Sequence, residues 1–238
     1  MSVDVMPGKT STTCPARPIE GPGPPALAAL AGTDEAGRGP LAGPLVAAAA
    51  VLTAEQERAL TGLGLRDSKR MTPRKREDVF RAMCEMGVVW RAQAASVGTI
   101  ARLNVLRASL WAMEKSVLKL PSPVGLVVVD GPHTLPGLAR QQIALVAADD
   151  LVPAVSAASV AAKVLRDRVM VVLDRLYPQY GFAKHKGYPT REHRDAVRAF
   201  GLSPVHRPEF CRKLLNNRDS QGPEALERGS GRSPEILF

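Results

Sequence analysis

Apolar runs and helix-like periods fill the middle of this chain and are absent from both of its ends. Residues 1–28 and 216–238 are polar and rich in Pro, Gly and Ser, so we predict a disordered tail at each end. Residues 29–215 are expected to form one domain, because 45% hydrophobic residues in a chain of 238 suffice for a core of that size.

Short apolar runs bounded by Gly, Pro or charged residues predict the strands. Residues 45–52 (LVAAAAVL) form a continuous apolar run, typical of a strand that is buried on both faces, although alanine is a weak strand former. The predicted strands are Leu27–Thr33, Leu45–Leu52, Val88–Val97, Leu126–Val129 and Gln142–Val146.

Helical periods lie between these runs and after them. Thr72 and Pro73 are typical of an N-cap and a first helical residue, and Gly87 is typical of a helix end. The predicted helices are Pro73–Met86, Ile100–Leu120, Ser156–Leu176 and Thr190–Phe200. Strands that come mainly first, with helices between them, predict an α/β fold with a mixed central β-sheet flanked by helices and a helical C-terminal part.

The charge of the chain favours a polyanionic partner. The formal net charge is +9 and the pI is near 9.9, which suits nucleic acid. Aromatic residues make up only 4%, which argues against a single-strand binder that stacks bases on aromatic rings.

Cysteine content and hydropathy bear on the compartment. Cys14, Cys84 and Cys211 are far apart and odd in number, so neither a disulfide framework nor a zinc cluster is indicated. No apolar run reaches the roughly 18 residues of a membrane span, and residues 26–31 are too short for a signal peptide. We therefore expect a reduced, cytoplasmic protein that does not enter the membrane.

Two adjacent carboxylates, Asp34 and Glu35, follow the first predicted strand and precede a Gly-Arg-Gly turn. Neighbours on a strand point to opposite faces, so we expect the backbone to leave strand geometry here, as Gly37 and Gly39 permit. A surface turn would also contain Asp and Gly, but strand ends are where α/β proteins place their ligands.

Further carboxylates follow two later apolar runs. Asp130 follows LVVV, and Asp149 and Asp150 follow IALVAA. Strand-end carboxylates drawn from three places in the chain suit a hard cation such as Mg²⁺, which binds through a few carboxylates and substrate phosphate. Paired ions of this kind clamp the attacking and leaving oxygens of a phosphodiester.

A dinucleotide site is the rival interpretation of the glycines. Gly37, Gly39 and Gly43 approach the G-x-G-x-x-G motif, but their spacing differs, and Pro40 and Pro44 interrupt the helix that should follow.

Two more segments carry candidate phosphate ligands. Ser156, Ser159, Lys163 and Arg166 have helical spacing and predict one polar stripe. An ordinary solvated face accounts for Arg166, whereas a closely approaching phosphate accounts better for the two serines and the lysine. Residues 67–69 (DSK) and the loop 180–188 add further cations. In the loop 180–188 the cations alternate with aromatic rings, which indicates a recognition loop rather than a basic surface loop.

Taken in order, these motifs resemble the type 2 ribonucleases H (ribonuclease HII) over about residues 30–210. The matching segments are DEAGRGPLAGP (34–44), DSK (67–69), VVDG (128–131), Asp149 with Ser159 ten residues later, AAKVLRDR (161–168) and YPQYGFAKHKGYPT (177–190).

The resemblance implies a ribonuclease H-like fold and Mn²⁺- or Mg²⁺-dependent hydrolysis of the RNA strand of RNA–DNA hybrids. It also implies cleavage on the 5′ side of single ribonucleotides embedded in duplex DNA. Two-metal-ion hydrolysis would leave 3′-hydroxyl and 5′-phosphate ends. We expect the protein to act as a monomer.

The resemblance also implies roles for individual residues. The catalytic and metal-binding acids match Asp34, Glu35, Asp130 and Asp149. The turn that reads the sugar at the ribo–deoxyribo junction matches Gly37, Arg38 and Gly39, and the junction-sensing tyrosine matches Tyr188. Our further candidates for substrate binding are Lys69, Ser159 and Lys163.

Three alternatives stay open at this point. Asp150 adjoins Asp149, although the ten-residue spacing to Ser159 favours Asp149 as the fourth acid. The chain could be a nucleic-acid-binding module without catalysis, which the presence of all four acids opposes. It could also be another metal nuclease of the same fold, such as a resolvase or a type 1 enzyme, which the Gly-Arg-Gly turn and the Tyr188 loop oppose.

Overall fold

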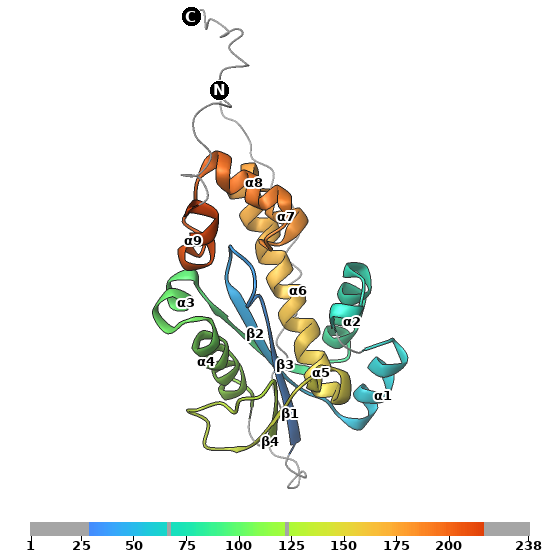
Figure 1. The fold of residues 1–238 in the computed structure, drawn as a ribbon. Helices are drawn as coiled ribbons and strands as arrows, with labels where there is room; N and C mark the ends of the chain where they lie inside the picture. Colours follow the sequence, from blue (N-terminus) through green and yellow to red (C-terminus); the bar gives the residue numbers. More distant parts are fainter. Residues whose placement is uncertain (1–28, 66–67, 122–123, 217–238) are drawn as a thin grey trace, which may run out of the picture.

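The computed structural model describes residues 29–65, 68–121 and 124–216. At its centre is a five-stranded mixed sheet with the order β3-β2-β1-β4-β5 (Figure 1). Its strands are β1 (Ala29–Ala36), β2 (Leu45–Val51), β3 (Val89–Ala95), β4 (Val124–Asp130) and β5 (Gln141–Leu145). The first three strands form an antiparallel meander, whereas β4 runs parallel to β1 and β5 parallel to β4. The predicted α/β class with a mixed sheet is confirmed.

Helices cover both faces of this sheet (Figure 1). The α-helices are α1 (Ala54–Gly62), α2 (Pro73–Glu85), α3 (Val97–Leu103), α4 (Val105–Leu118), α5 (Ala148–Leu151), α6 (Pro153–Leu176), α7 (Phe182–His185), α8 (Arg191–Phe200) and α9 (Pro208–Asn216). Two short 3₁₀ turns, η1 (Ser68–Arg70) and η2 (Pro178–Tyr180), complete the elements of the described residues. None of the helices in this part of the chain has the length and apolar character needed to cross a bilayer.

The alanine run of β2 explains how two helices come close to the sheet. Ala47 and Ala49 belong to the core on the α4 side, and Ala48 and Ala50 to the core on the α6 side. Small side chains on both faces let α4 and α6 pack tightly, which compensates for the low strand propensity of alanine. The closest approach is at Gly32, where an added Cβ would lie 2.2 Å from the amide nitrogen of Val155.

The C-terminal helices α7 and α8 lie at the far end of α6, and α9 contacts α8 (Figure 1). Their shared core contains Met170, Phe182 and Val197, so the predicted helical C-terminal part is confirmed. Thr190 caps α8 by accepting a hydrogen bond from the amide of His193, as predicted.

Several predicted boundaries are wrong. Strand β1 does not end at Thr33 but continues through Ala36. The helix predicted over 100–120 is two helices, because Asn104 adopts φ 65° and its side chain caps α4 at the amide of Arg107. Helix α6 begins at Pro153, and helices α1, α5, α7 and α9 were not predicted. The predicted tails lie outside the described residues, apart from Asn216.

Candidate active site

The first two acids lie on a continuous strand, contrary to the expectation that the backbone would leave strand geometry there. Asp34 pairs with Ala48 and Glu35 with Ala47 in the β1–β2 ladder. Their side chains therefore point to opposite faces. The Asp34 carboxylate accepts a hydrogen bond from Ser159 of α6, whereas Glu35 lies beside Ser109 of α4.

Asp130 interacts with both Asp34 and Glu35, although these two side chains point to opposite faces of the sheet. It ends β4, the parallel neighbour of β1, and its charge raises the pKa of both Asp34 and Glu35. Its Oδ1 also accepts a hydrogen bond from the amide of Ala148 at 2.9 Å, which fixes the start of α5. Three of the predicted acids thus share one electrostatic environment at the ends of β1 and β4.

Asp149 was expected at a strand end, but it lies on the short helix α5. Asp149 is only 3% exposed, and its backbone carbonyl accepts a 2.6 Å hydrogen bond from the hydroxyl of Ser156. The adjacent Asp150 is exposed and forms an ion pair with Arg70 at 3.4 Å. Burial therefore supports Asp149, rather than Asp150, as the fourth acid.

Burial also sets the ionisation of the acids. Desolvation is the main cause that raises the pKa of Asp34, and the charges of Glu35 and Asp130 raise it further. Burial raises the pKa of Glu35 too, while Arg38, 3.5 Å from its Oε1, opposes the shift. Buried anions next to one another are costly unless a cation is nearby.

The donor set of these residues fits a hard divalent cation. All four acids supply oxygen, the ligand type that Mg²⁺ and Mn²⁺ take. Within residues 29–65, 68–121 and 124–216, no group of three or more acidic, His or Cys side chains is arranged to hold a metal ion by itself. Mg²⁺ usually keeps several waters and binds proteins through one or two carboxylates together with substrate phosphate.

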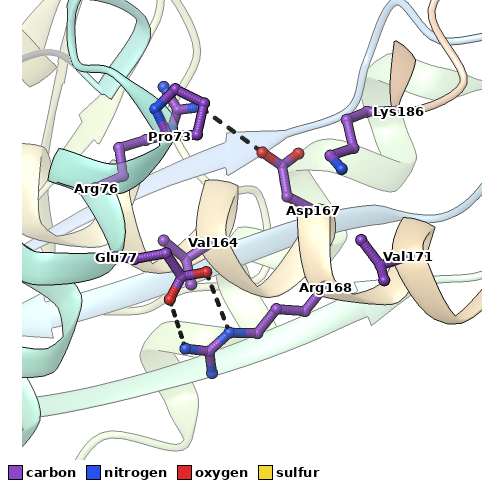
Figure 2. A pocket seen from close by; sticks show the side chains of 8 residues that line it. All are labelled: Pro73, Arg76, Glu77, Val164, Asp167, Arg168, Val171 and Lys186. Carbon is purple, nitrogen blue, oxygen red and sulfur yellow. Dashed lines mark hydrogen bonds and ion pairs between the residues drawn. The ribbon is translucent and has the colours of Figure 1, made fainter. Parts of the chain in front are cut away.

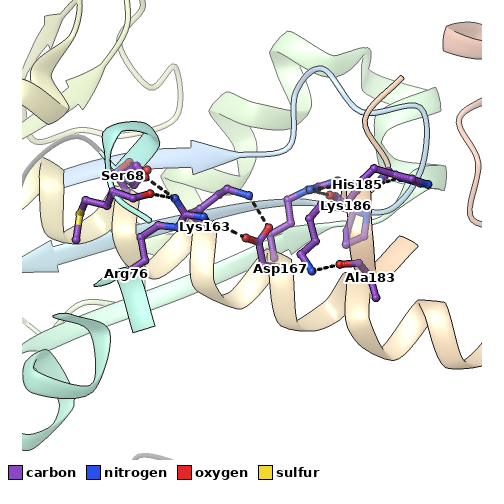
Figure 3. Close-up of polar contacts among 12 residues, drawn as sticks. Ser68, Arg76, Lys163, Asp167, Ala183, His185 and Lys186 are labelled. Atoms are coloured by element: carbon purple, nitrogen blue, oxygen red, sulfur yellow. Dashed lines mark hydrogen bonds and ion pairs between the residues drawn. The ribbon is translucent and has the colours of Figure 1, made fainter. Parts of the chain in front are cut away.

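A chain of hydrogen bonds connects Asp34 to the DSK segment. The hydroxyl of Ser159 contacts the Asp34 carboxylate and, at 2.8 Å, the hydroxyl of Ser68. The backbone of this segment is held by Arg76 of α2, which donates to the carbonyls of Ser68 at 2.7 Å and Met71 at 2.6 Å (Figure 3). Ser159 is therefore placed to orient a catalytic acid, which differs from its predicted contact with substrate. Asp67 and the side chain of Lys69 lie outside the described part of the structure.

The polar stripe predicted on α6 faces the protein more than the solvent. Ser156, Ser159 and Arg166 are all buried, so a solvated face does not account for Arg166. Lys163 is half-buried, donates to Asp167 at 2.5 Å, and has its pKa lowered by burial (Figure 3). Asp167 also forms an ion pair with Arg76 at 3.7 Å.

A shallow pocket of about 250 Å³ lies between α2 and α6, next to Lys163 (Figure 2). Its cations are partly neutralised, because Arg168 forms an ion pair with Glu77 at 2.7 Å and Asp167 contacts Arg76. The lining residues are Pro73, Arg76, Glu77, Val164, Asp167, Arg168, Val171 and Lys186.

The Gly-Arg-Gly turn lies against the loop that contains Tyr188. The amide of Leu41 donates to the carbonyl of Gly187 at 2.8 Å. A Cβ added at Gly39 would lie 4.0 Å from the Tyr188 ring, which is itself 40% exposed. The structure thus brings together the turn and the tyrosine that the sequence predicted for the junction.

The two outer residues of this turn need glycine for different reasons. Gly37 has φ 101°, and a Cβ there would lie 2.1 Å from Nε of Arg166. Gly39 has an ordinary φ, and its added Cβ would meet nothing closer than the Tyr188 ring. No contact within the described chain requires glycine at position 39, which is the pattern expected where a ligand approaches the backbone.

Sequence reasoning missed two buried groups that support this region. Arg207 donates to carbonyls of the turn and was not singled out. Nδ1 of His193 donates to the carbonyl of Tyr188 at 2.9 Å, and its Nε2 contacts Nε2 of His206 at 3.1 Å.

Comparison with known proteins gives a consistent result. The sequence profile of the family described as "Ribonuclease HII" matches residues 31–213. The chain is 43% identical over 190 residues to Ribonuclease HII of Synechocystis sp., covering 80% of this chain and all of that protein. It is 46% identical over 188 residues to Ribonuclease HII of Marinomonas sp., covering 78% of this chain and 92% of that protein.

A solved structure agrees with these sequence matches. The crystal structure of ribonuclease H2 from Pyrococcus horikoshii superposes with a TM-score of 0.66 at 27% identity, covering 81% of this chain and 99% of that one.

Proposed function

The chain belongs to the ribonuclease HII family, hydrolases that cut RNA in RNA–DNA hybrids, and we propose that it also cuts 5′ of single ribonucleotides embedded in duplex DNA. The products would carry 3′-hydroxyl and 5′-phosphate ends. The observation that carries this proposal is that Asp34, Glu35 and Asp130 interact at the ends of β1 and β4, while the turn that follows β1 lies against the partly exposed ring of Tyr188.

The family depends on divalent metal ions, and Asp34, Glu35, Asp130 and Asp149 would hold Mg²⁺ or Mn²⁺ here. When bound, such ions supply Lewis-acid stabilisation of the attacking and leaving oxygens in a two-metal-ion hydrolysis.

Residues of the chain keep these acids in place. Ser159 donates to Asp34, and the amide of Glu35 donates to Oδ1 of Asp34 at 2.6 Å, so the carboxylate has a fixed orientation. The amide of Ala148 donates to Asp130 and holds its carboxylate. Since Asp149 is the next residue in α5, this hydrogen bond also helps to position Asp149. Fixed acids reduce the reorganisation that the reaction requires.

Recognition of the junction would use the turn and the tyrosine. Backbone groups of residues 37–39 would contact the ribose hydroxyl, since buried or aligned polar groups discriminate well against a sugar that lacks it. Tyr188 would stack on the neighbouring deoxyribose. Arg38, with 47% of its side chain exposed, is a phosphate ligand in this proposal, and Lys69 and Lys163 are further ones.

The net charge of +9 supports binding of duplex nucleic acid through its phosphates. Residues 29–215 would be the catalytic domain.

The test is a cleavage assay on three duplexes of one sequence. One carries a single ribonucleotide, one is an RNA–DNA hybrid, and one is all DNA. We expect cleavage of the first two, with a 5′-phosphate at the ribonucleotide, and none of the third. Binding without cleavage would indicate the non-catalytic module, and cleavage of the hybrid alone would indicate the specificity of a type 1 enzyme.

A further inference from the structure

Arg207 is buried behind the Gly-Arg-Gly turn and makes four hydrogen bonds to carbonyls, two in the turn and two at Gly43. It donates to Gly37 O at 2.8 Å, to Arg38 O at 3.1 Å, and twice to Gly43 O, at 2.8 and 3.0 Å. Arg207 is 1% exposed and forms no ion pair with any described residue. One guanidinium thus holds the first two carbonyls of the turn and the carbonyl of Gly43 beyond it.

These bonds determine where the amides of the turn point. In a planar trans peptide, the carbonyl of one residue and the N–H of the next point in opposite directions. Since the carbonyls of Gly37 and Arg38 point at Arg207, the N–H groups of Arg38 and Gly39 point away from it. Both residues are exposed, and neither N–H has a hydrogen-bond partner in the described part of the chain. Two free donors are therefore presented on the outer side of the turn.

A second buried arginine holds the same segment. Arg166 of α6 donates to Pro44 O at 3.0 Å, Ala42 O at 3.2 Å and Lys186 O at 3.0 Å, and so connects the turn to the Tyr188 loop. Burial and the nearby charge of Arg166 lower the pKa of Arg207 to about 10, so both stay cationic at neutral pH.

Two buried cations that form no ion pair with any described residue are expensive for a fold that needs only stability. Apolar side chains of similar volume would serve a core as well or better. An arginine fork is justified where several carbonyls must be kept in one orientation, because its donors are rigidly spaced.

We propose that Arg207 is a positioning residue for ribose recognition: it orients the Gly37–Arg38 and Arg38–Gly39 peptides so that the amides of Arg38 and Gly39 face the 2′-hydroxyl. The inference rests on the proposed function, because it assigns the residue that makes the turn competent to read a single ribonucleotide. Arg207 does not touch the substrate itself.

The test compares affinities for two duplexes that differ by one 2′-hydroxyl. Fluorescence anisotropy in Ca²⁺ buffer, with a gel to confirm intact strands, gives the ratio of Kd values for the all-DNA and the single-ribonucleotide duplex. We expect the full-length parent to prefer the ribonucleotide at least several-fold. In Arg207→Met the ratio should fall close to one, with little change in affinity for the all-DNA duplex.

Two further variants separate positioning from general stability. Arg207→Lys keeps the charge but lacks the fork, and we expect it to lose the preference while folding better than Arg207→Met. Arg76→Met also removes a buried arginine that donates to two carbonyls, but in the 68–71 segment. Arg76→Met should keep the parent's ratio, even if it melts at a lower temperature.

The outcomes distinguish this inference from the proposed function. A parent that does not cut the single-ribonucleotide duplex in Mg²⁺ or Mn²⁺ overturns the proposed function. A parent that cuts it and prefers it, with an Arg207→Lys variant that keeps the same Kd ratio, overturns the role of Arg207 alone. Equal weakening of both duplexes in the Arg207 variants would also overturn it, because a merely structural residue gives that result.

Discussion

The protein around Asp34 disfavours the ionised form of its carboxyl group. Burial, Glu35 and Asp130 all raise its pKa, so the ionised carboxylate costs folding free energy at neutral pH. The same charge would attract a divalent cation. The residue therefore serves chemistry at the expense of stability, as active-site residues often do.

Replacing this acid should separate the two properties. In Asp34→Asn, we expect a Tm in chelator that is higher than the parent's, by roughly 2–4 °C for about 1 kcal/mol, because a buried like charge is removed. Cleavage of an RNA–DNA hybrid should fall about 10³-fold or more. Thermal melts with and without Mn²⁺ check this, and the variant should also lose part of the parent's stabilisation by the ion. A variant that melts well below the parent in chelator would contradict the prediction.

The fourth acid can be tested against its neighbour. Asp149→Asn should lower the cleavage rate about 10³-fold, because it removes a buried ligand charge, whereas Asp150→Asn should keep most of the activity. Asp150 is exposed and pairs with Arg70, so its loss affects only a surface ion pair. Rates measured on one hybrid under single-turnover conditions decide the ranking, and the reverse order would show that the register is shifted by one residue.

Gly39 should be dispensable for folding and needed for substrate. Gly39→Ala meets only the Tyr188 ring, at 4.0 Å, so we expect a Tm within about 1 °C of the parent's. The added methyl group occupies the side from which a ribose would approach, and kcat/KM on the single-ribonucleotide duplex should fall about 10²-fold.

Gly62→Ala is the matched control, because a Cβ there meets nothing within 4 Å and the residue lies at the end of α1. It should change neither Tm nor activity. Full activity of Gly39→Ala would show that no ligand approaches this glycine.

At the scale of elements, three histidine rings lock the Tyr188 loop onto α8 and the segment before α9. His185 stacks on His193 at 4.4 Å, and His193 contacts His206, whose Nδ1 accepts from the amide of Ser203 at 2.9 Å. Burial, and then the proximity of His193, lower the pKa of His206 to about 4. Burial lowers the pKa of His193 as well.

This cluster should make stability fall in mild acid. His206 has a folded pKa of about 4 and an unfolded value near 6.5, so its neutral form is favoured in the folded state. Its contribution is complete above about pH 6.5 and is lost as the pH falls toward 4. Tm should therefore drop between pH 7 and pH 4.5, and the drop should be smaller in His206→Asn. His133→Asn, at an exposed position, should leave the slope unchanged. An equal slope in the parent and His206→Asn would contradict this assignment.

The sequence predicted strong periodic elements well and local backbone geometry poorly. The apolar runs placed all five strands, and Thr72 with Pro73 placed the start of α2. The break at Asn104 was missed because a single left-handed residue leaves the apolar period on either side intact. Helix α5 was missed because four residues carry no period.

The candidate site shows the same division. The acids were singled out because charged residues next to apolar strands stand out, although the backbone geometry at Asp34 and Glu35 was misjudged. Arg166 and Arg207 could not be recognised as buried from the sequence, since arginine is mostly exposed in proteins. Their burial depends on carbonyls of residues 37–44, which are distant in the chain.

At the scale of the whole molecule, the two ends should be separable from the catalytic domain. Residues 1–28 and 217–238 lack apolar periodicity, so a chain of residues 29–216 should keep the parent's Tm and its kcat/KM on an RNA–DNA hybrid. Thermal melting and a cleavage assay of the truncated protein check this. A Tm lower by several degrees would show that one end packs on the domain.

The order of the strands has a consequence for how the protein is made. β1 carries the first two acids, but its parallel partner β4 and the acids Asp130 and Asp149 come about half a chain later, and Arg207 comes near the end. A growing chain on the ribosome can form the β1–β2–β3 meander early, yet the four proposed acids can come together only after β4 and α5 have emerged. Contacts between such distant segments also slow folding, because a long loop must close before they form. Nuclease activity should therefore arise only after the segments that contain Asp130 and Asp149 have emerged and packed onto β1.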